Sequence, residues 1–202
     1  MNQALKETIA ANLAAFPREA VDLETRRAAA VAVVLAPLDE VMTYIITRRA
    51  LTLRRNAGNY ALPGGHVEPG EDSIDAAIRE THEELGFLLE RSQVLGLLDD
   101  LPTRSGHIMT PVVFWSDEPV VIRPDPAEVQ QAWQNPLTEL DHPDSPMSEP
   151  HPDGGEPIKR MFVRGSWVNP PTAAVLYQFR EVALHARWTR VHMIGQPTWT
   201  AG

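Results

Sequence analysis

The segment 73–86, SIDAAIRETHEELG, constrains this chain most, because it combines a helical pattern with crowded negative charge. Asp72 or Ser73 would cap the start of a helix, and Gly86 stands where helices commonly end. An apolar residue recurs every three or four positions, which predicts a helix with one face on a hydrophobic core. The apolar positions are Ile74, Ala77, Ile78 and Leu85.

Three glutamates crowd the same segment. Glu80, Glu83 and Glu84 lie three or four residues apart or side by side, so on a helix they share one face. Each like-charge pair at this spacing destabilises a helix by roughly 0.2–0.5 kcal/mol. A divalent cation would remove the repulsion, and oxygen-rich ligands favour hard ions such as Mg2+ or Mn2+, which also bind phosphate oxygens. Arg79, next in the chain, could orient a carboxylate through a bidentate contact.

Glycines precede the helix at the end of a long predicted loop, 49–72. The PGG turn at 63–65 allows main-chain atoms to approach a metal ion or a phosphate closely, because glycine has no Cβ. An ordinary solvated helix rich in glutamate would explain the charges alone. It would not explain the spacing from Gly65 to Glu71 and from Glu71 to the glutamates of the helix.

At this spacing the stretch GHVEPGEDSIDAAIRETHEELGF resembles the signature of the Nudix hydrolases, G-x5-E-x7-R-E-U-x-E-E-x-G-U, where U is a bulky apolar residue. Every glycine, glutamate and arginine of that pattern is present, and Thr81 is the one departure. The resemblance implies an α/β fold, the Nudix α/β/α sandwich with a mixed β-sheet. It also implies hydrolysis of a nucleoside diphosphate linked to another moiety.

The resemblance further implies a role for each matching residue. Glu80 and Glu84 would be metal ligands, and Glu83 would be a ligand or the general base. Glu71 would support a further ion, and the Gly64 carbonyl would bind metal. The catalytic set is then Glu83, Glu80 and Arg79, and the identity of the base stays open between the glutamates.

A second pattern precedes the first one. IITRRALTLRRNAGNYALPGG, residues 45–65, is similar to the signature of the coenzyme A diphosphatases, with Leu62 where phenylalanine is usual. That resemblance implies cleavage of coenzyme A or acyl-coenzyme A to 3′,5′-ADP and a phosphopantetheine. Two alternatives stay open. One is a Nudix hydrolase of ADP-ribose or a dinucleotide, and the other is a non-catalytic nucleotide sensor.

Arginines of the same stretch form the densest basic cluster of an acidic chain, whose net charge is −9. Arg49 and Arg54 match the signature, and guanidinium groups suit phosphate, so we expect them to bind substrate. For Arg48, substrate contact and solvation of a strand end are equally consistent with the sequence. Gly65 and His66 complete the expected substrate site. The tryptophans Trp115 and Trp133 would either stack on adenine or pack in the core.

The remaining pattern predicts a mixed sheet with helices on both faces. Residues 1–25 form a helical extension, 26–188 the Nudix domain and 189–202 a tail. A helix is expected over 3–15 and another after Pro171, and 127–137 is ambiguous between helix and strand. Loops are expected at 49–72 and 141–157, and His107 and His151 are expected in loops. The expected strands are 28–36, 41–48, 93–100, 108–115, 119–123 and the segment RMFVRGSWV.

The negative net charge argues against a nucleic-acid partner or an anionic-membrane partner. No cysteine is present, which suits a reducing cytoplasm. The N-terminus lacks a signal-peptide pattern, and the stretch RRAAAVAVVLAPL is read as a buried strand and not as a twin-arginine signal. The N-terminal helix has one apolar side that would dock on the domain or on a second copy, which leaves a homodimer open.

Overall fold

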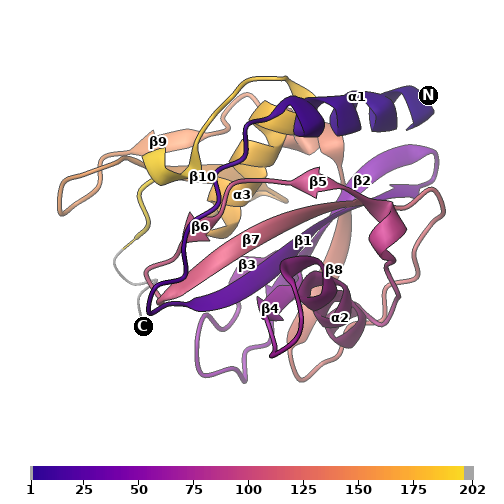
Figure 1. Cartoon of the computed structure of the whole chain (residues 1–202), viewed down its shortest axis with the longest axis horizontal. Coiled ribbons are helices and arrows are strands. Elements are labelled where there is room, and N and C mark those ends of the chain that lie inside the picture. Colours follow the sequence, from indigo (N-terminus) through magenta and orange to yellow (C-terminus); the bar gives the residue numbers. More distant parts are fainter. Residues whose placement is uncertain (1, 198–202) are drawn as a thin grey trace.

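The computed structural model describes residues 2–197, and a mixed eight-stranded sheet forms its centre (Figure 1). The main path of the sheet runs β3-β2-β1-β7-β5, and β4, β6 and β8 pair with β1, β7 and β2. β1 and β7 are parallel, and the other pairs are antiparallel. The strands are β1 (Arg27–Leu38), β2 (Val41–Arg49), β3 (Tyr60–Ala61), β4 (Gly64–His66), β5 (Val94–Leu97), β6 (Leu101–Pro102), β7 (His107–Trp115) and β8 (Val129–Pro136).

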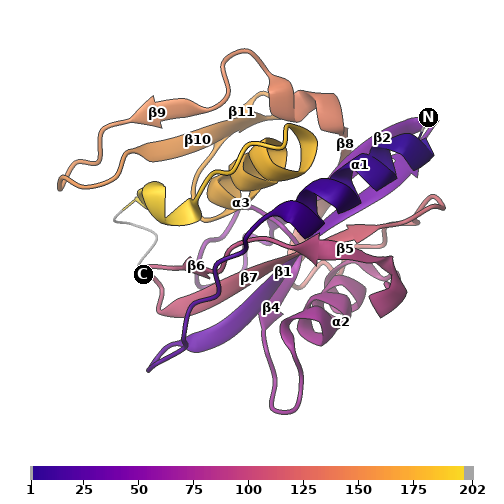
Figure 2. The ribbon, with the colours of Figure 1, turned by 45° about the horizontal axis from the view of Figure 1, so that its top comes forward.

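Helices cover both faces of this sheet, as Figure 2 shows most clearly. α2 (Ser73–Leu85) lies on one face, and α1 (Asn2–Ala15) and α3 (Thr172–Phe179) lie on the other, with a π-helical turn, Arg180–Leu184, after α3. A smaller sheet of order β11-β10-β9 lies beside α3. Its strands are β9 (Met147–Glu149), β10 (Ile158–Val163) and β11 (Ser166–Val168), and short 3-10 turns occupy Arg91–Gln93, Leu137–Asp141 and Val191–Met193. The predicted α/β/α sandwich is therefore confirmed.

The central strand β1 is buried on both sides because its sequence is apolar almost throughout. Alternate residues point to opposite faces of a strand. Val33 and Leu35 therefore join the core beneath α1 and α3, whereas Ala30 and Ala32 join the core beneath α2. The small alanines on the second face allow α2 to pack closely against the strand. Fully burying each larger side chain contributes about 1.5–3 kcal/mol.

Capping fixes both ends of α2 close to the predicted positions. The Asp72 carboxylate accepts hydrogen bonds from the amides of Ile74 and Asp75, both at 2.9 Å. Gly86 adopts a left-handed φ of 74°, and its amide bonds to the His82 carbonyl. The start of the glutamate helix is thus set by Asp72, and Ser73 is its first residue.

α1 is part of the main core. Its residues Ile9 and Leu13, followed by Phe16, are buried in the same cluster as α3 and the sheet. The helix therefore docks on its own domain, and the boundary drawn at residue 25 stays a prediction. The predicted tail, 189–202, lies partly outside the described residues, and its described part includes the buried Val191 and Ile194.

Some predicted elements were wrong. The segment 119–123 is not a strand, although Val120 and Ile122 pack against the α2 core. The segment 127–137, which the sequence left open between helix and strand, contains the strand β8. The loops 49–72 and 141–157 contain the short strands β3, β4 and β9. RMFVRGSWV is a hairpin and not one strand, because Arg164 and Gly165 turn with φ values of 52° and 74°. His107 opens β7 and is not a loop residue.

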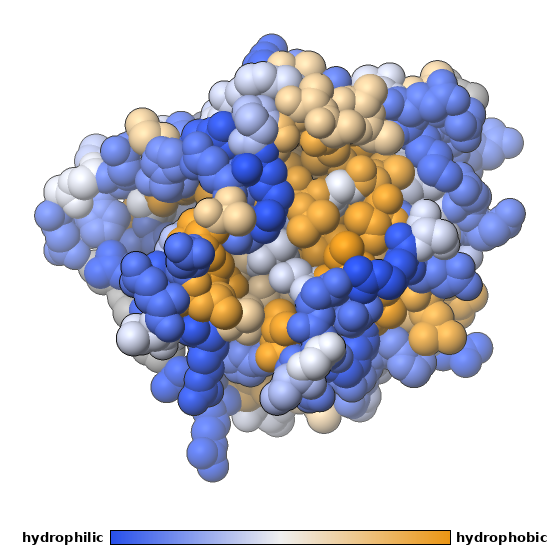
Figure 3. Space-filling view, in the orientation of Figure 1, coloured by the Kyte–Doolittle hydropathy of each residue, from blue (hydrophilic) through white to orange (hydrophobic). Residues whose placement is uncertain are grey.

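Hydrophobic residues also gather on the surface over β5, below α1 (Figure 3). Leu95 and Leu97 of β5 are half-buried there and extend the two cores outward. Among the described residues no helix has the length and apolar character needed to cross a membrane.

Candidate active site

Arg79 joins α2 to the loop in front of it. Its guanidinium donates to Glu71 at 2.8 and 3.1 Å, to Glu80 at 2.9 Å and to Glu83 at 3.0 Å. A further hydrogen bond of 2.8 Å reaches the His66 carbonyl at the end of β4. The hydrogen bonds from Arg79 hold the pKa of Glu71 below its usual value. One cation thus fixes three carboxylates and the glycine-containing strand relative to the helix.

A second group of carboxylates lies beside this arginine network. Glu80 and Glu84 of α2 meet Glu128, which precedes β8, and one carboxylate oxygen of each lies within 4.8 Å of the others. Burial, and then the charges of Glu80 and Glu128, raise the pKa of Glu84 to about 8, against the opposing influence of Arg49. Burial likewise raises the pKa of Glu80. The cluster therefore carries more negative charge than its surroundings accommodate.

These oxygens have the chemistry of a hard-cation site. Carboxylates are the ligands that Mg2+ and Mn2+ prefer, and Glu84 is only 3% exposed, so bulk water cannot screen its charge. No lysine or arginine forms an ion pair with Glu84 or Glu128 in the described part of the chain. The residues present therefore fit a divalent ion.

Two glycines of β4 close the gap between this cluster and the sheet. A Cβ at Gly65 would overlap the Glu80 carboxylate, and one at Gly64 would overlap the Ala30 carbonyl of β1. Gly64 has a φ of 153°, which side chains rarely adopt, and its amide donates a hydrogen bond to Glu84. The turn therefore requires glycine because the carboxylates and the backbone meet there.

A cavity of about 370 Å³ opens on the other side of the glycine pair. Its walls come from β1, β3, β4, the start of β7 and residues 167–171, which run from the end of β11 to α3, and they include Tyr60 and Trp167. None of the lining residues is an aspartate or a glutamate, although the chain has 27 acidic residues. Arg49, His66 and His107 are the lining residues with basic side chains. The cavity thus suits a ligand that is partly flat and apolar and partly anionic.

Comparison with known proteins agrees with this geometry. The NUDIX domain family model matches residues 25–153. The chain belongs to the Nudix family.

Curated Nudix relatives share part of the chain. The Nudix hydrolase NudL of Photorhabdus laumondii is 40% identical over 98 residues, which is 48% of this chain and 52% of the relative. Nudix hydrolase 3 of Caenorhabditis elegans is 33% identical over 144 residues, which is 68% of this chain and 59% of that protein. The chain spans little more than half the length of these relatives.

A solved structure extends the likeness in fold. The Nudix hydrolase RenU of M. smegmatis superposes with a TM-score of 0.53 at 20% identity, covering 82% of this chain and 90% of that one. The similarity supports the Nudix fold for most of the chain.

The Nudix structure brings most predicted site residues together. Glu71, Arg79, Glu80, Glu83 and Glu84 form one connected network with the glycine turn. Within it, Glu83 keeps a half-exposed side chain and bonds to Arg79, outside the group that Glu80 and Glu84 form with Glu128.

The predicted basic residues separate into two kinds. Arg49 lines the cavity and acts electrostatically on Glu84, and its buried Nε has no hydrogen-bond partner among residues 2–197. Arg48 instead donates to the Gly58 carbonyl at 3.0 Å, which holds the loop between β2 and β3, and Arg54 is exposed in that loop. Neither Arg48 nor Arg54 lines the cavity.

Sequence reasoning missed Glu128 and Trp167. Glu128 belongs to no part of the Nudix signature, and it reaches the cluster because β8 pairs with β2. Trp167 lines the cavity, whereas Trp115 is buried and bonds to Asp117 at 2.8 Å. Trp133 packs against Tyr60, with ring centroids 5.7 Å apart, and so stands behind the cavity wall.

Proposed function

We propose that this Nudix protein hydrolyses the diphosphate bond of coenzyme A or acyl-coenzyme A, releasing 3′,5′-ADP and a 4′-phosphopantetheine. One observation carries the proposal: a three-carboxylate cluster and a carboxylate-free cavity meet at Gly64 and Gly65. A diphosphate at the glycine pair would face the cluster, while the rest of the substrate occupies the cavity. The match of Arg49 to the coenzyme A diphosphatase signature favours this substrate class.

The carboxylates would hold Mg2+ or Mn2+ through Glu80, Glu84 and Glu128, with the Gly64 carbonyl as a further ligand. Such an ion neutralises developing charge on the diphosphate and lowers the pKa of water. Glu71 would serve a further ion, as the signature implies. Binding of the ion would also relieve the repulsion that raises the pKa of Glu84.

The chain's own residues supply positioning and proton transfer. Arg79 holds Glu71, Glu80 and Glu83 in place through its hydrogen bonds. Either Glu80 or Glu83 accepts the proton of the attacking water, which adds to one phosphorus as the anhydride P–O bond breaks. Glu83 is the more accessible of the two, and Glu80 has the raised pKa that favours a base.

The test is turnover with Mg2+ or Mn2+ on a panel of coenzyme A, acetyl-coenzyme A, ADP-ribose and a diadenosine polyphosphate, with products identified by mass spectrometry. We expect 3′,5′-ADP and phosphopantetheine from coenzyme A. Preferred cleavage of ADP-ribose or the dinucleotide would keep the chemistry and overturn the substrate. Binding without turnover on every compound would indicate a nucleotide sensor.

A further inference from the structure

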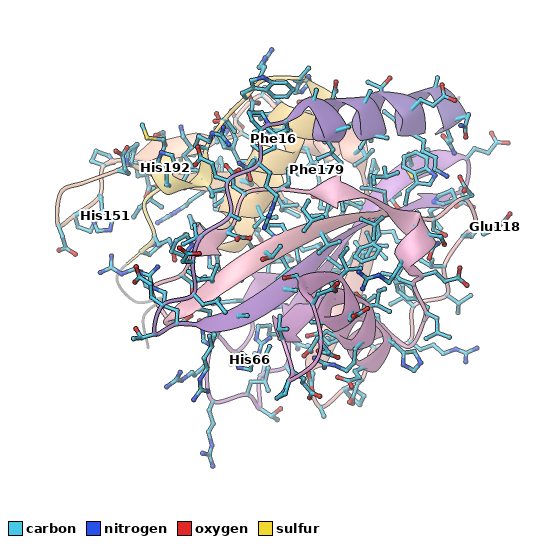
Figure 4. The ribbon with its side chains drawn as sticks, in the orientation of Figure 1. Phe16, His66, Glu118, His151, Phe179 and His192 are labelled. Carbon is cyan, nitrogen blue, oxygen red and sulfur yellow. The ribbon has the colours of Figure 1, made fainter. Side chains whose placement is uncertain are left out.

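The cavity continues past the glycine pair to two histidines from different strands. His66 ends β4 and His107 begins β7, and both line the cavity. Their ring centroids are 4.8 Å apart, with an angle of 37° between the ring planes. Figure 4 labels His66 below the sheet, where β4 lies. His66 follows Gly65 directly in the chain, and neither histidine belongs to the carboxylate cluster.

Hydroxyl groups fix the orientation of the His107 ring. The Ser105 hydroxyl lies 3.1 Å from His107 Nδ1, and the Thr103 hydroxyl lies 3.0 Å from that of Ser105. All three residues line the cavity. The Thr103 hydroxyl donates to the His107 carbonyl at 3.1 Å and so accepts from Ser105, whose hydroxyl accepts in turn from Nδ1–H of His107. The protonated ring then has a second N–H donor, on Nε2, on the side away from Ser105.

The surroundings of His107 are positively charged. Burial first, and then His66, Arg27 and Arg55, lower the pKa of His107. Neither Arg27 nor Arg55 has a carboxylate within ion-pair distance in the part of the chain that the structure describes. Arg27 pairs with His107 across β1 and β7, and Arg55 also acts electrostatically on His107. In a chain with a net charge of −9, neither arginine has an ion-pair partner among the described residues. An anion would supply that partner.

We propose that His107, oriented by Ser105 and flanked by His66, Arg27 and Arg55, binds a phosphate monoester of the nucleotide. The inference rests on the proposed function, in which this group is the 3′-phosphate of coenzyme A. The diphosphate then lies at Gly64 and Gly65, and the ribose spans the short step to His66. Arg49 sits at the opposite end, close to Glu84, and serves the diphosphate.

The experiment measures binding of 3′,5′-ADP and 5′-AMP by calorimetry in excess EDTA, so that it needs neither metal nor turnover. We expect the wild type to bind 3′,5′-ADP about ten- to a hundredfold more tightly than 5′-AMP, the range of a charge-assisted hydrogen bond. His107→Ala should reduce that ratio to within about threefold while leaving 5′-AMP affinity nearly unchanged. Ser105→Ala should reduce the ratio less, because it only orients the ring.

His192→Ala is the matched control, since His192 is exposed on the turn Val191–Met193 and lies well away from His66 in Figure 4. It should leave both affinities unchanged. Each variant's melting temperature is measured beside wild type. Arg27→Ala and Arg55→Ala, both at exposed positions, test the subsite independently should His107→Ala fold poorly.

The outcomes separate this inference from the proposed function. The subsite would be overturned if His107→Ala weakened the binding of both nucleotides equally, or if no variant changed the ratio of the two affinities. Either result would count against the subsite even if coenzyme A is hydrolysed. A ratio that depends on His107 in a protein that does not hydrolyse coenzyme A would support the subsite and overturn the proposed substrate.

Discussion

Two neighbouring regions of the site have opposite chemistry. On the α2 side of the glycine pair, Glu80, Glu84 and Glu128 crowd together without an arginine or lysine paired to Glu84 or Glu128 among the described residues. On the other side, the cavity has no carboxylate in its lining, and its charged groups are basic. The contrast shows that net charge alone does not decide what an acidic chain binds. Its charges are sorted by region: among the described residues Glu84 and Glu128 have no ion-pair partner on one side, and the basic groups of the cavity have no carboxylate in the lining on the other.

The most severe test of this comparison is removal of divalent metal. If the carboxylate cluster needs a cation, excess EDTA should abolish measurable turnover, and added Mg2+ or Mn2+ should restore it. The assay is product release from coenzyme A before and after dialysis against chelator. Full turnover in EDTA would contradict the metal role of the cluster.

Glu84→Gln should lower kcat at least a hundredfold, because it removes one ligand charge from the cluster. The fold should survive, and the metal-free variant should melt no lower than wild type, since a neutral amide escapes the repulsion of Glu80 and Glu128. Glu118→Gln is the matched control: Glu118 is an exposed glutamate far from α2 (Figure 4) and should keep wild-type kcat. An unfolded Glu84→Gln protein would show that the cluster is structural.

The pH dependence of metal-free stability sharpens the contrast between the regions. The folded pKa of Glu84, about 8, lies above its ordinary value of 4.5, so the folded state binds the proton more tightly than the unfolded state does. The stabilisation that comes from protonated Glu84 is fully present below pH 4.5 and is lost as the pH rises through about 8. We expect a loss of a few kcal/mol in the free energy of unfolding, measured by urea denaturation in EDTA. Glu84→Gln should flatten that part of the profile, and a wild-type profile equally flat would contradict the assignment.

Arg49→Ala tests the border between the two regions. Arg49 acts electrostatically on Glu84, and we therefore expect it to bind the diphosphate and not the 3′-phosphate. The variant should lose about tenfold in kcat/KM on both coenzyme A and dephospho-coenzyme A, as expected for one charge-assisted contact. Arg48→Ala, which removes only a bond to the Gly58 carbonyl, is the comparison variant. A loss confined to coenzyme A would return Arg49 to the 3′-phosphate.

The smallest effect concerns the cap that begins α2. Asp72→Ala should lower the free energy of unfolding by about 1 kcal/mol, the usual value of a side-chain cap. Hydrogen bonds from Arg91 and from the amides of Asp75 and Ile74 lower the pKa of Asp72 to about 2. The stabilisation that the Asp72 charge gives to the folded state is therefore present above pH 3.8 and is lost as the pH falls through about 2. Solvent screening at this exposed position reduces that stabilisation. Urea denaturation at pH 7 and pH 2.5 measures it, and equal destabilisation at both would contradict the charge contribution.

Local patterns predicted the elements that have strong local signals. β1, β2 and α2 appear close to their predicted bounds, because continuous apolar runs and capping residues act over short distances. The segment 119–123 is not a strand although Val120 and Ile122 alternate as in one. Pro119 begins it and Pro124 follows it, and the α2 core packs against the two apolar side chains. The hairpin at Arg164 and Gly165 lacked a run of turn residues that would have divided RMFVRGSWV.

The site divides in the same way. The glutamates of α2 and their arginine could be predicted because one helix and its preceding loop hold them all. Glu128 could not, because only the pairing of β8 with β2 brings it beside Glu84. The His66–His107 contact likewise depends on both β4 and β7 pairing with β1. Contacts made across a sheet leave no spacing signal in a single sequence.

The segment between β11 and α3 has a consequence for how such a protein could diverge. Residues from Trp167 to Pro171 form a wall of the cavity, yet none of them belongs to the carboxylate cluster. Selection could therefore reshape this wall for a longer acyl chain or a different base without disturbing the carboxylates of the cluster. Duplicated copies of the gene would be expected to differ first between β11 and α3, and last in α2.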